Sequence, residues 1–175
     1  STSDKTTETG ASELLSLYDS ISTETKYVAM SDLPEIAAKE SYTIGVAMTD
    51  VSTGWFKALY DHVNEKLTEA GVTVHLVQCN DDAAMQVDQI NTFIAQGVDA
   101  IIINPANPQE TVTSALDDCA ASGIPVVAVD TPPETGSAYM TACVTDAYSL
   151  GKMVGMELAT RLLEMYPDME SIPYG

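Results

Sequence analysis

Residues 97–105, Gly97-Val-Asp-Ala-Ile-Ile-Ile-Asn-Pro105, decide the fold that the sequence predicts. The apolar run in this segment is short and does not alternate with polar residues, which is typical of a strand that is covered on both faces. The segment Gly123-Ile-Pro-Val-Val-Ala-Val-Asp130 has the same character. Further strands are expected at 43–49, 72–78 and 139–144. Strands of this kind belong to a parallel sheet that is enclosed by helices.

Amphipathic segments separate these strands, and their ends carry helix signals. Helices are expected at 54–70, 82–96, 107–121 and 146–165. Asp82 is suited to cap the second of these helices and Gly97 to close it. The third begins with Asn107-Pro-Gln-Glu110, which combines an N-cap with Pro at the first helical position. Alternating strands and helices with right-handed crossovers predict an α/β fold, a doubly wound parallel sheet flanked by helices in three layers.

The length of the chain limits the number of domains. Its 175 residues suffice for one compact core but not for two full lobes, and we expect residues 41–175 to form one lobe. Residues 1–40 begin with a Ser- and Thr-rich stretch and are interpreted as a polar leader or tether, with a short helical stripe at 11–21. No apolar run in the sequence approaches the roughly 18 residues that a membrane span requires.

The charge of the chain is strongly negative. Seven basic residues face 26 acidic ones, so the formal charge is −19. This charge repels phosphate backbones and anionic membranes, and no nucleic-acid partner is expected. Between Ser41 and Asp130 the only basic residues are Lys57 and Lys66, and Arg161 is the sole arginine. Because ligands rich in phosphate or carboxylate normally meet Arg or Lys, a neutral ligand is favoured.

The sequence lacks the motifs of common catalytic and cofactor sites. It contains no Gly-x-Gly-x-x-Gly or phosphate-binding loop after the first strand, no Gly-x-Ser-x-Gly and no His-Glu-x-x-His. His62 and His75 have no metal-ligand neighbours and are interpreted as structural. The cysteines, Cys79, Cys119 and Cys143, fit no zinc spacing and are expected to be free, buried thiols. We therefore expect no catalytic residue, no metal and no cofactor, and a protein that is not an enzyme.

Polar residues follow the strands at the edge where doubly wound sheets bind ligands. The first strand leads into Thr49-Asp-Val-Ser-Thr-Gly-Trp-Phe56, which holds hydroxyls, a carboxylate and the only tryptophan. An aromatic ring beside a few polar groups suits a sugar, whose C–H face packs on the ring. Trp55 either faces the cleft in this way or caps the core. Asp130 either accepts hydrogen bonds from two ligand hydroxyls or caps the turn before Thr131, and Asp50 either contacts the ligand or caps the next helix.

Four stretches, taken together in order and spacing, resemble the ribose- and galactose-type members of the type I periplasmic binding protein family. They are Ile44-Gly-Val-Ala-Met with Gly54-Trp-Phe56, Asn80-Asp-Asp with Gln86-Val-Asp-Gln-Ile90, Gly97–Pro105 and Gly123–Asp130. A fifth stretch, Val144–Gly155, resembles the family's next motif, so the resemblance covers about residues 42–161. Asn104-Pro105 is interpreted as a structural turn that lines the cleft wall.

The resemblance also implies a set of ligand-binding residues. The loop after the first strand of the family supplies a polar contact and stacking aromatics, which correspond to Thr49, Thr53, Trp55 and Phe56. The aspartate that ends the fourth strand, here Asp130, binds sugar hydroxyls. An arginine follows it in ribose binders, whereas this chain has Thr131, which we expect to contact the ligand in its place, and Thr53 stands where asparagine is common. These departures count against ribose itself and leave a small neutral sugar or polyol as the expected ligand.

Family members have two lobes joined by three crossovers, and hinge closure traps the sugar between them. This chain ends at Gly175, about where the first crossover strand should start. We expect a fragment rather than a natural half, with weak affinity for sugar and a cleft face that favours homodimers.

The resemblance implies an extracytoplasmic solute-binding protein that serves the membrane permease of an ABC importer, either periplasmic or anchored as a surface lipoprotein. A sensor input for chemotaxis or a two-component system is a variant of this role. The effector core of a sugar-responsive repressor shares the fold but would carry a basic helix-turn-helix, which residues 1–40 do not resemble. A Rossmann-like enzyme is the third alternative, and the missing cofactor motif counts against it.

Overall fold

The computed structural model describes residues 41–52, 54–107, 109–134 and 136–166. The leader at 1–40, with its predicted helical stripe, lies outside the described residues. The chain divides into two compact units at the junction between Cys143 and Val144. The assignment of all residues from 41 to 175 to one lobe therefore stays a prediction.

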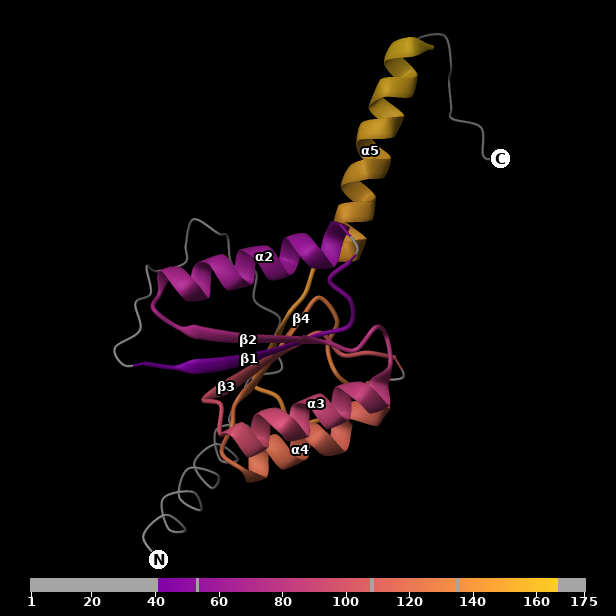
Figure 1. Cartoon of the computed structure of the whole chain (residues 1–175). Coiled ribbons are helices and arrows are strands. Elements are labelled where there is room, and N and C mark those ends of the chain that lie inside the picture. The colour runs from indigo at the N-terminus through magenta and orange to yellow at the C-terminus, as the bar shows by residue number, and fades with distance from the viewer. Residues whose placement is uncertain (1–40, 53, 108, 135, 167–175) are drawn as a thin grey trace, which may run out of the picture. The chain divides into compact units, whose positions relative to one another are not determined.

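The first unit is built on a parallel sheet of five strands (Figure 1). The strands are β1 (Thr43–Met48), β2 (Thr73–Gln78), β3 (Ala100–Ile103), β4 (Val126–Val129) and β5 (Thr141–Cys143). They lie in the order β2-β1-β3-β4-β5, and every adjacent pair is parallel. The predicted doubly wound α/β fold is confirmed. The sequence predicts the fourth strand over 124–129, whereas β4 begins at Val126, because Pro125 has no N–H to donate to the ladder.

Helices cover both faces of this sheet. The helix α2 (Gly54–Glu69) covers one face, whereas α3 (Ala83–Gln96) and α4 (Thr113–Ala121) cover the other (Figure 1). Asp82 caps α3 as predicted, since its Oδ1 accepts a hydrogen bond of 3.0 Å from the N–H of Met85. Gly97 closes α3 in the left-handed conformation with a φ of 67°.

The predicted single helix over 107–121 is wrong in its first half. Residues Gln109–Val112 form a 3₁₀ turn, η2, and α4 begins only at Thr113. Thr111, Val112 and Thr113 are β-branched, which lowers helix propensity because their side chains lose rotamer freedom against the preceding turn. A short 3₁₀ turn is the usual form of such a connector.

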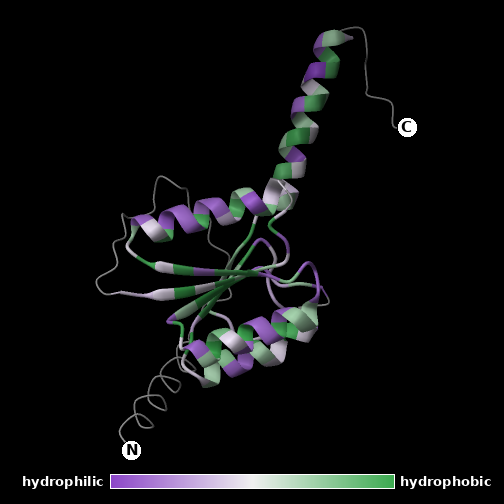
Figure 2. Cartoon of the chain, in the orientation of Figure 1, coloured by the Kyte–Doolittle hydropathy of each residue, from purple (hydrophilic) through white to green (hydrophobic). Residues whose placement is uncertain are grey.

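Two apolar clusters hold the layers together. Ile101, Ile103 and Val126 of the sheet are buried against Ile90 of α3 and Leu116 of α4. The opposite face buries Val46 and Met48 under α2, where partly buried Phe56, Leu59 and Val63 complete the contact. Figure 2 shows the corresponding pattern, with hydrophobic strands at the centre of the sheet and polar residues distributed along the outer helices.

The second unit contains one helix, α5 (Ala147–Met165), in its described part. Asp146 caps it, accepting a hydrogen bond of 3.0 Å from the N–H of Ser149. Arg161 pairs with Glu157 and Glu164 at 2.9 and 3.3 Å on its surface. Across the described residues, we find no helix whose length and apolar character would let it cross a membrane.

The strand β1 passes directly under α3 at Gly45, which makes this position sensitive to substitution. A Cβ atom at Gly45 would lie 2.6 Å from Cδ2 of the buried Phe93 ring. We expect Gly45→Ala to lower the free energy of unfolding by about 1–3 kcal/mol through overpacking, measured by urea denaturation. Gly54→Ala is the matched control, because nothing lies within 4 Å of its added Cβ, and it should leave the midpoint almost unchanged. Equal midpoints for the two variants would contradict this account.

The three cysteines are free, but they differ in burial. Cys79 and Cys119 are buried as predicted, whereas Cys143 is exposed, so the prediction of three buried thiols is wrong at this position. Cys143 lies on β5, the last strand in the order of the sheet, which pairs with β4. Burial raises the pKa of the Cys119 thiol to about 12 and also raises that of Cys79.

Because the thiolate is the reactive form, thiol reagents should distinguish the cysteines. The native protein should react rapidly with Ellman's reagent at Cys143 alone, and the two remaining thiols should react only after denaturation. Cys143→Ser should abolish the rapid phase. A rapid phase that persists in this variant would contradict the burial of the other two.

Candidate functional site

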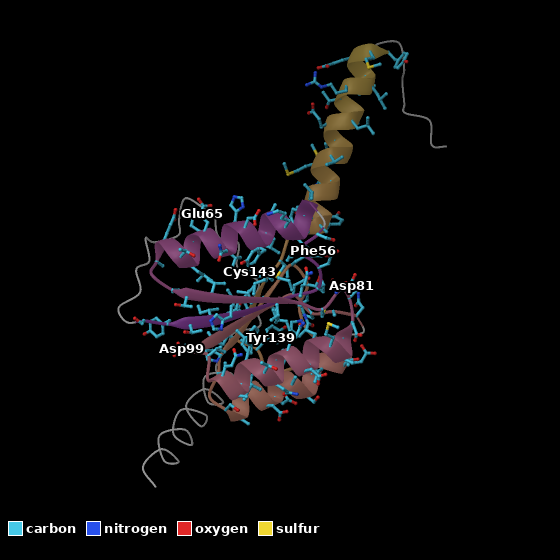
Figure 3. The ribbon with its side chains drawn as sticks, viewed as in Figure 1. Phe56, Glu65, Asp81, Asp99, Tyr139 and Cys143 are labelled. Carbon is cyan, nitrogen blue, oxygen red and sulfur yellow. The ribbon has the colours of Figure 1, made fainter. Side chains whose placement is uncertain are left out.

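The polar residues of interest gather at the carboxyl ends of the strands. The order of strands places β1 beside β3, and the helices that follow β1 and β3 lie on opposite faces of the sheet. Such a reversal of winding is where open α/β sheets bind ligands. Figure 3 shows Phe56 and Asp81 near the carboxyl ends of the strands. Asp99, which precedes β3, lies at the opposite end.

A buried amide connects the ends of three strands. The Thr49 hydroxyl donates a hydrogen bond of 2.6 Å to Oδ1 of Asn104, and Nδ2 of Asn104 donates one of 3.2 Å to the carbonyl of Val129. Asn104 is only 1% exposed. Thr49, which was expected to contact the ligand, is also buried, and its hydroxyl is engaged inside the protein. Asn104 is structural, as expected, but it acts through its side chain and not through a turn, because its amide links the residue after β1 to the end of β4. That it lines a cleft wall stays a prediction.

Gln86 extends this buried network to α3. Its Nε2 donates to the carbonyl of Asn104 at 2.9 Å, and its Oε1 accepts from the N–H of Ala106 at 2.9 Å. The side chain is fully buried. Sequence reasoning did not single it out as a functional residue. The available signal was its place on the same helix face as Ile90 and Phe93, where a polar residue must find hydrogen-bond partners on burial.

The part of the site outside the buried network consists of exposed Trp55 and half-buried Asp130. The indole Nε1 of Trp55 donates a hydrogen bond of 3.1 Å to Oδ1 of Asp130. Oδ2 of Asp130 accepts a hydrogen bond of 3.2 Å from the Thr131 hydroxyl. Trp55 is 60% exposed and belongs to none of the apolar clusters of the described residues, so it does not cap the core. That the ring faces a ligand cleft stays a prediction. Asp130 has a φ of 67°, in the left-handed region that Asp tolerates better than most residues.

The remaining residues of the loop after β1 have different roles. Phe56 packs against the apolar cluster under α2. Asp50 accepts hydrogen bonds from the N–H and the hydroxyl of Ser52 at 2.7 and 2.8 Å, and these bonds lower the pKa of its carboxyl group. These bonds hold a local turn in the loop before α2, and both alternatives for Asp50 stay predictions. Thr53 lies outside the described residues.

The histidines and acidic residues do not assemble into a metal centre in the described part of the chain, where no group of three or more potential ligands is found. Nδ1 of His62 lies 2.9 Å from the carbonyl of Ala58, one helical turn earlier. This contact agrees with the structural interpretation of His62.

Residues 44–164 match the family model described as the periplasmic binding protein domain. The chain belongs to this family. It is 28% identical over 124 residues to the ribose import binding protein of Bacillus subtilis, covering 71% of this chain and 40% of the relative. The chain therefore spans about 40% of the length of this curated relative.

Solved structures of solute-binding proteins also match the chain. An ABC transporter solute-binding protein from Mycobacterium smegmatis with bound glycerol matches with a TM-score of 0.63 and 27% identity, covering 71% of this chain and 42% of its own. The fructose-binding periplasmic domain of a hybrid two-component system matches with a TM-score of 0.57 and 30% identity, covering 69% and 40%. The chain has the fold of one lobe of these proteins.

The buried network predicts a large effect of Asn104. Asn104→Leu leaves the Thr49 hydroxyl and the Val129 carbonyl without their partner, and each unsatisfied buried group costs about 1–3 kcal/mol. We expect a loss of about 2–4 kcal/mol in the free energy of unfolding, measured by urea denaturation. Asn91→Leu, at an exposed position on α3, makes the same chemical change and should alter stability by less than about 0.5 kcal/mol. Similar losses in both variants would contradict the role of the network.

Proposed function

We propose that this chain is the ligand-binding lobe of an extracytoplasmic solute-binding protein that captures a small neutral sugar or polyol. Asp130 carries the proposal, because its carboxylate lies at the end of β4 with an exposed indole ring beside it. In the whole protein, a second lobe closes over the ligand by hinge motion, and the closed form delivers it to the permease of an ABC importer.

The chemistry of Asp130 suits a ligand with neighbouring hydroxyl groups. An ionised carboxylate offers about four lone-pair positions. Trp55 and Thr131 each occupy one of them, one on each oxygen. Each oxygen therefore keeps a position that can accept a hydrogen bond from a hydroxyl group, and the indole face can pack on the C–H face of a sugar.

The charges around the site favour a neutral ligand. Lys57 and Lys66 are the only basic residues between 41 and 143. Both lie on α2, where Lys57 pairs with Asp61 at 2.6 Å and Lys66 with Glu69 at 2.7 Å. An anionic ligand beside Asp130 would meet a like charge without a cation to offset it. The same argument counts against a nucleotide cofactor.

The role of the whole protein is proposed from its relatives. The Bacillus subtilis relative is named for ribose import, and the Mycobacterium smegmatis protein is an ABC transporter component, which supports transport. The fructose-binding domain belongs to a two-component system, which supports sensing as the second candidate. Both roles place the sugar site outside the cytoplasm, in the periplasm or on a surface lipoprotein.

Titration of the isolated chain with neutral and anionic ligands tests the proposal. We expect D-fructose or glycerol to quench or shift the fluorescence of Trp55, the only tryptophan, with dissociation constants in the millimolar range because only one lobe surrounds the ligand. Asp130→Ala should abolish the saturable change. Asp88→Asn, an exposed carboxylate on α3, is the control for loss of charge and should bind as the wild type does.

Two results would overturn the proposal. Saturable binding of ribose 5-phosphate or of a nucleotide in preference to every neutral sugar would overturn the neutral-ligand assignment. No saturable change with a broad panel of monosaccharides and polyols would overturn the sugar assignment and leave only the fold.

A further inference from the structure

We propose that the hydrogen bond from Trp55 to Asp130 positions the indole ring as a preformed platform for the ligand. Asp130 then has two tasks, accepting hydrogen bonds from ligand hydroxyls and fixing the ring on which the ligand packs. The inference rests on the proposed function of the site. It assigns to the indole N–H a positioning role that an aromatic ring without a donor cannot perform.

Among the described residues, the hydrogen bond to Asp130 is the contact that fixes the Trp55 ring. Trp55 is 60% exposed and belongs to none of the apolar clusters found among the described residues, in contrast to its neighbour Phe56. An exposed side chain of this size has several rotamers available, and packing selects among them only when other side chains surround it. The bond to a carboxylate is charge-assisted and therefore stronger than a bond between neutral groups.

Asp130, which accepts this hydrogen bond, is itself held in place by neighbouring groups. The N–H of Asp130 donates a hydrogen bond of 2.9 Å to the carbonyl of Cys143, on the neighbouring strand β5. The Thr131 hydroxyl holds the second carboxylate oxygen at 3.2 Å. The residue before Asp130 is Val129, whose carbonyl accepts from the buried amide of Asn104. The position of the indole is thus connected to the rigid centre of the sheet, although the ring itself lies outside the core.

Positioning of this kind raises affinity without adding a contact to the ligand. A ring that is already held in one orientation does not lose conformational freedom when the ligand binds, and this loss is a main cost of forming a site from flexible side chains. The N–H does not compete with the ligand, because each oxygen of Asp130 retains a lone-pair position. The bond and the ligand can therefore be present together.

The single tryptophan allows a direct test by NMR without any ligand. The indole N–H of the intact chain should give one signal, and its proton should exchange with water about tenfold or more slowly than that of N-acetyltryptophanamide. Asp130→Ala should return the exchange rate to that of the free indole. Asp130→Asn, which keeps a neutral acceptor, should lie between the two, and Asp88→Asn should leave the signal unchanged. A wild-type indole that exchanges like the model compound would overturn the inference.

Binding measurements then distinguish the positioning role of the indole N–H from the contribution of the aromatic ring itself. With D-ribose, D-fructose and glycerol as probes, Trp55→Phe keeps an aromatic ring but loses the donor, and we expect about a three- to tenfold weaker dissociation constant for a probe that binds. Trp55→Ala should weaken binding further. Because Trp55→Phe removes the fluorophore, the probes are followed by chemical-shift changes at the backbone amides around Asp130.

The outcomes distinguish this inference from the function on which it rests. Equal binding of a probe by Trp55→Phe and the wild type would overturn the positioning role and leave the sugar site intact. A protected indole in a wild type that binds none of the probes would count against the sugar site itself, and the platform role would fail with it.

Discussion

The hydrogen bonds of the Asn104 amide are the constraint on which the site depends. The last residues of parallel strands have backbone groups that the ladder no longer pairs, and burying them unpaired is costly. The Asn104 side chain pairs one such group, the carbonyl of Val129 at the end of β4, and also accepts a hydrogen bond from the Thr49 hydroxyl after β1. The loop after β1 and the turn at Asp130 therefore start from strand ends that are fixed relative to each other.

Much of the fold could be predicted because each element carries a local signal. Continuous apolar runs marked the buried strands, and Asp82 and Gly97 marked the ends of α3 as the structure has them. The start of α4 could not be read in this way, because the N-cap signal at Asn107 and the β-branched residues at 111–113 favour different local structures. Their balance depends on tertiary packing, which a local pattern does not contain.

The members of the candidate site could be predicted only in part. Their place at the strand ends follows from the topology, but their roles depend on partners that are distant in sequence. Thr49 bonds Asn104, 55 residues away, and Trp55 bonds Asp130, 75 residues away. The periodicity of apolar residues predicts which side chains are buried. It does not predict which polar atoms form hydrogen bonds with each other. Gln86 was missed for the same reason, since its position on an apolar helix face becomes informative only once its partners are known.

The Trp55–Asp130 pair also limits the kind of ligand that fits. The polar edge of the indole is satisfied by Asp130, so what remains unpartnered is the apolar face of the ring. The carboxylate beside it still accepts hydrogen bonds but repels anions. A complementary ligand therefore needs an apolar face and hydroxyl groups along one edge, without negative charge. A sugar ring combines these properties, whereas a phosphate or dicarboxylate offers only acceptors to a site that already presents an acceptor.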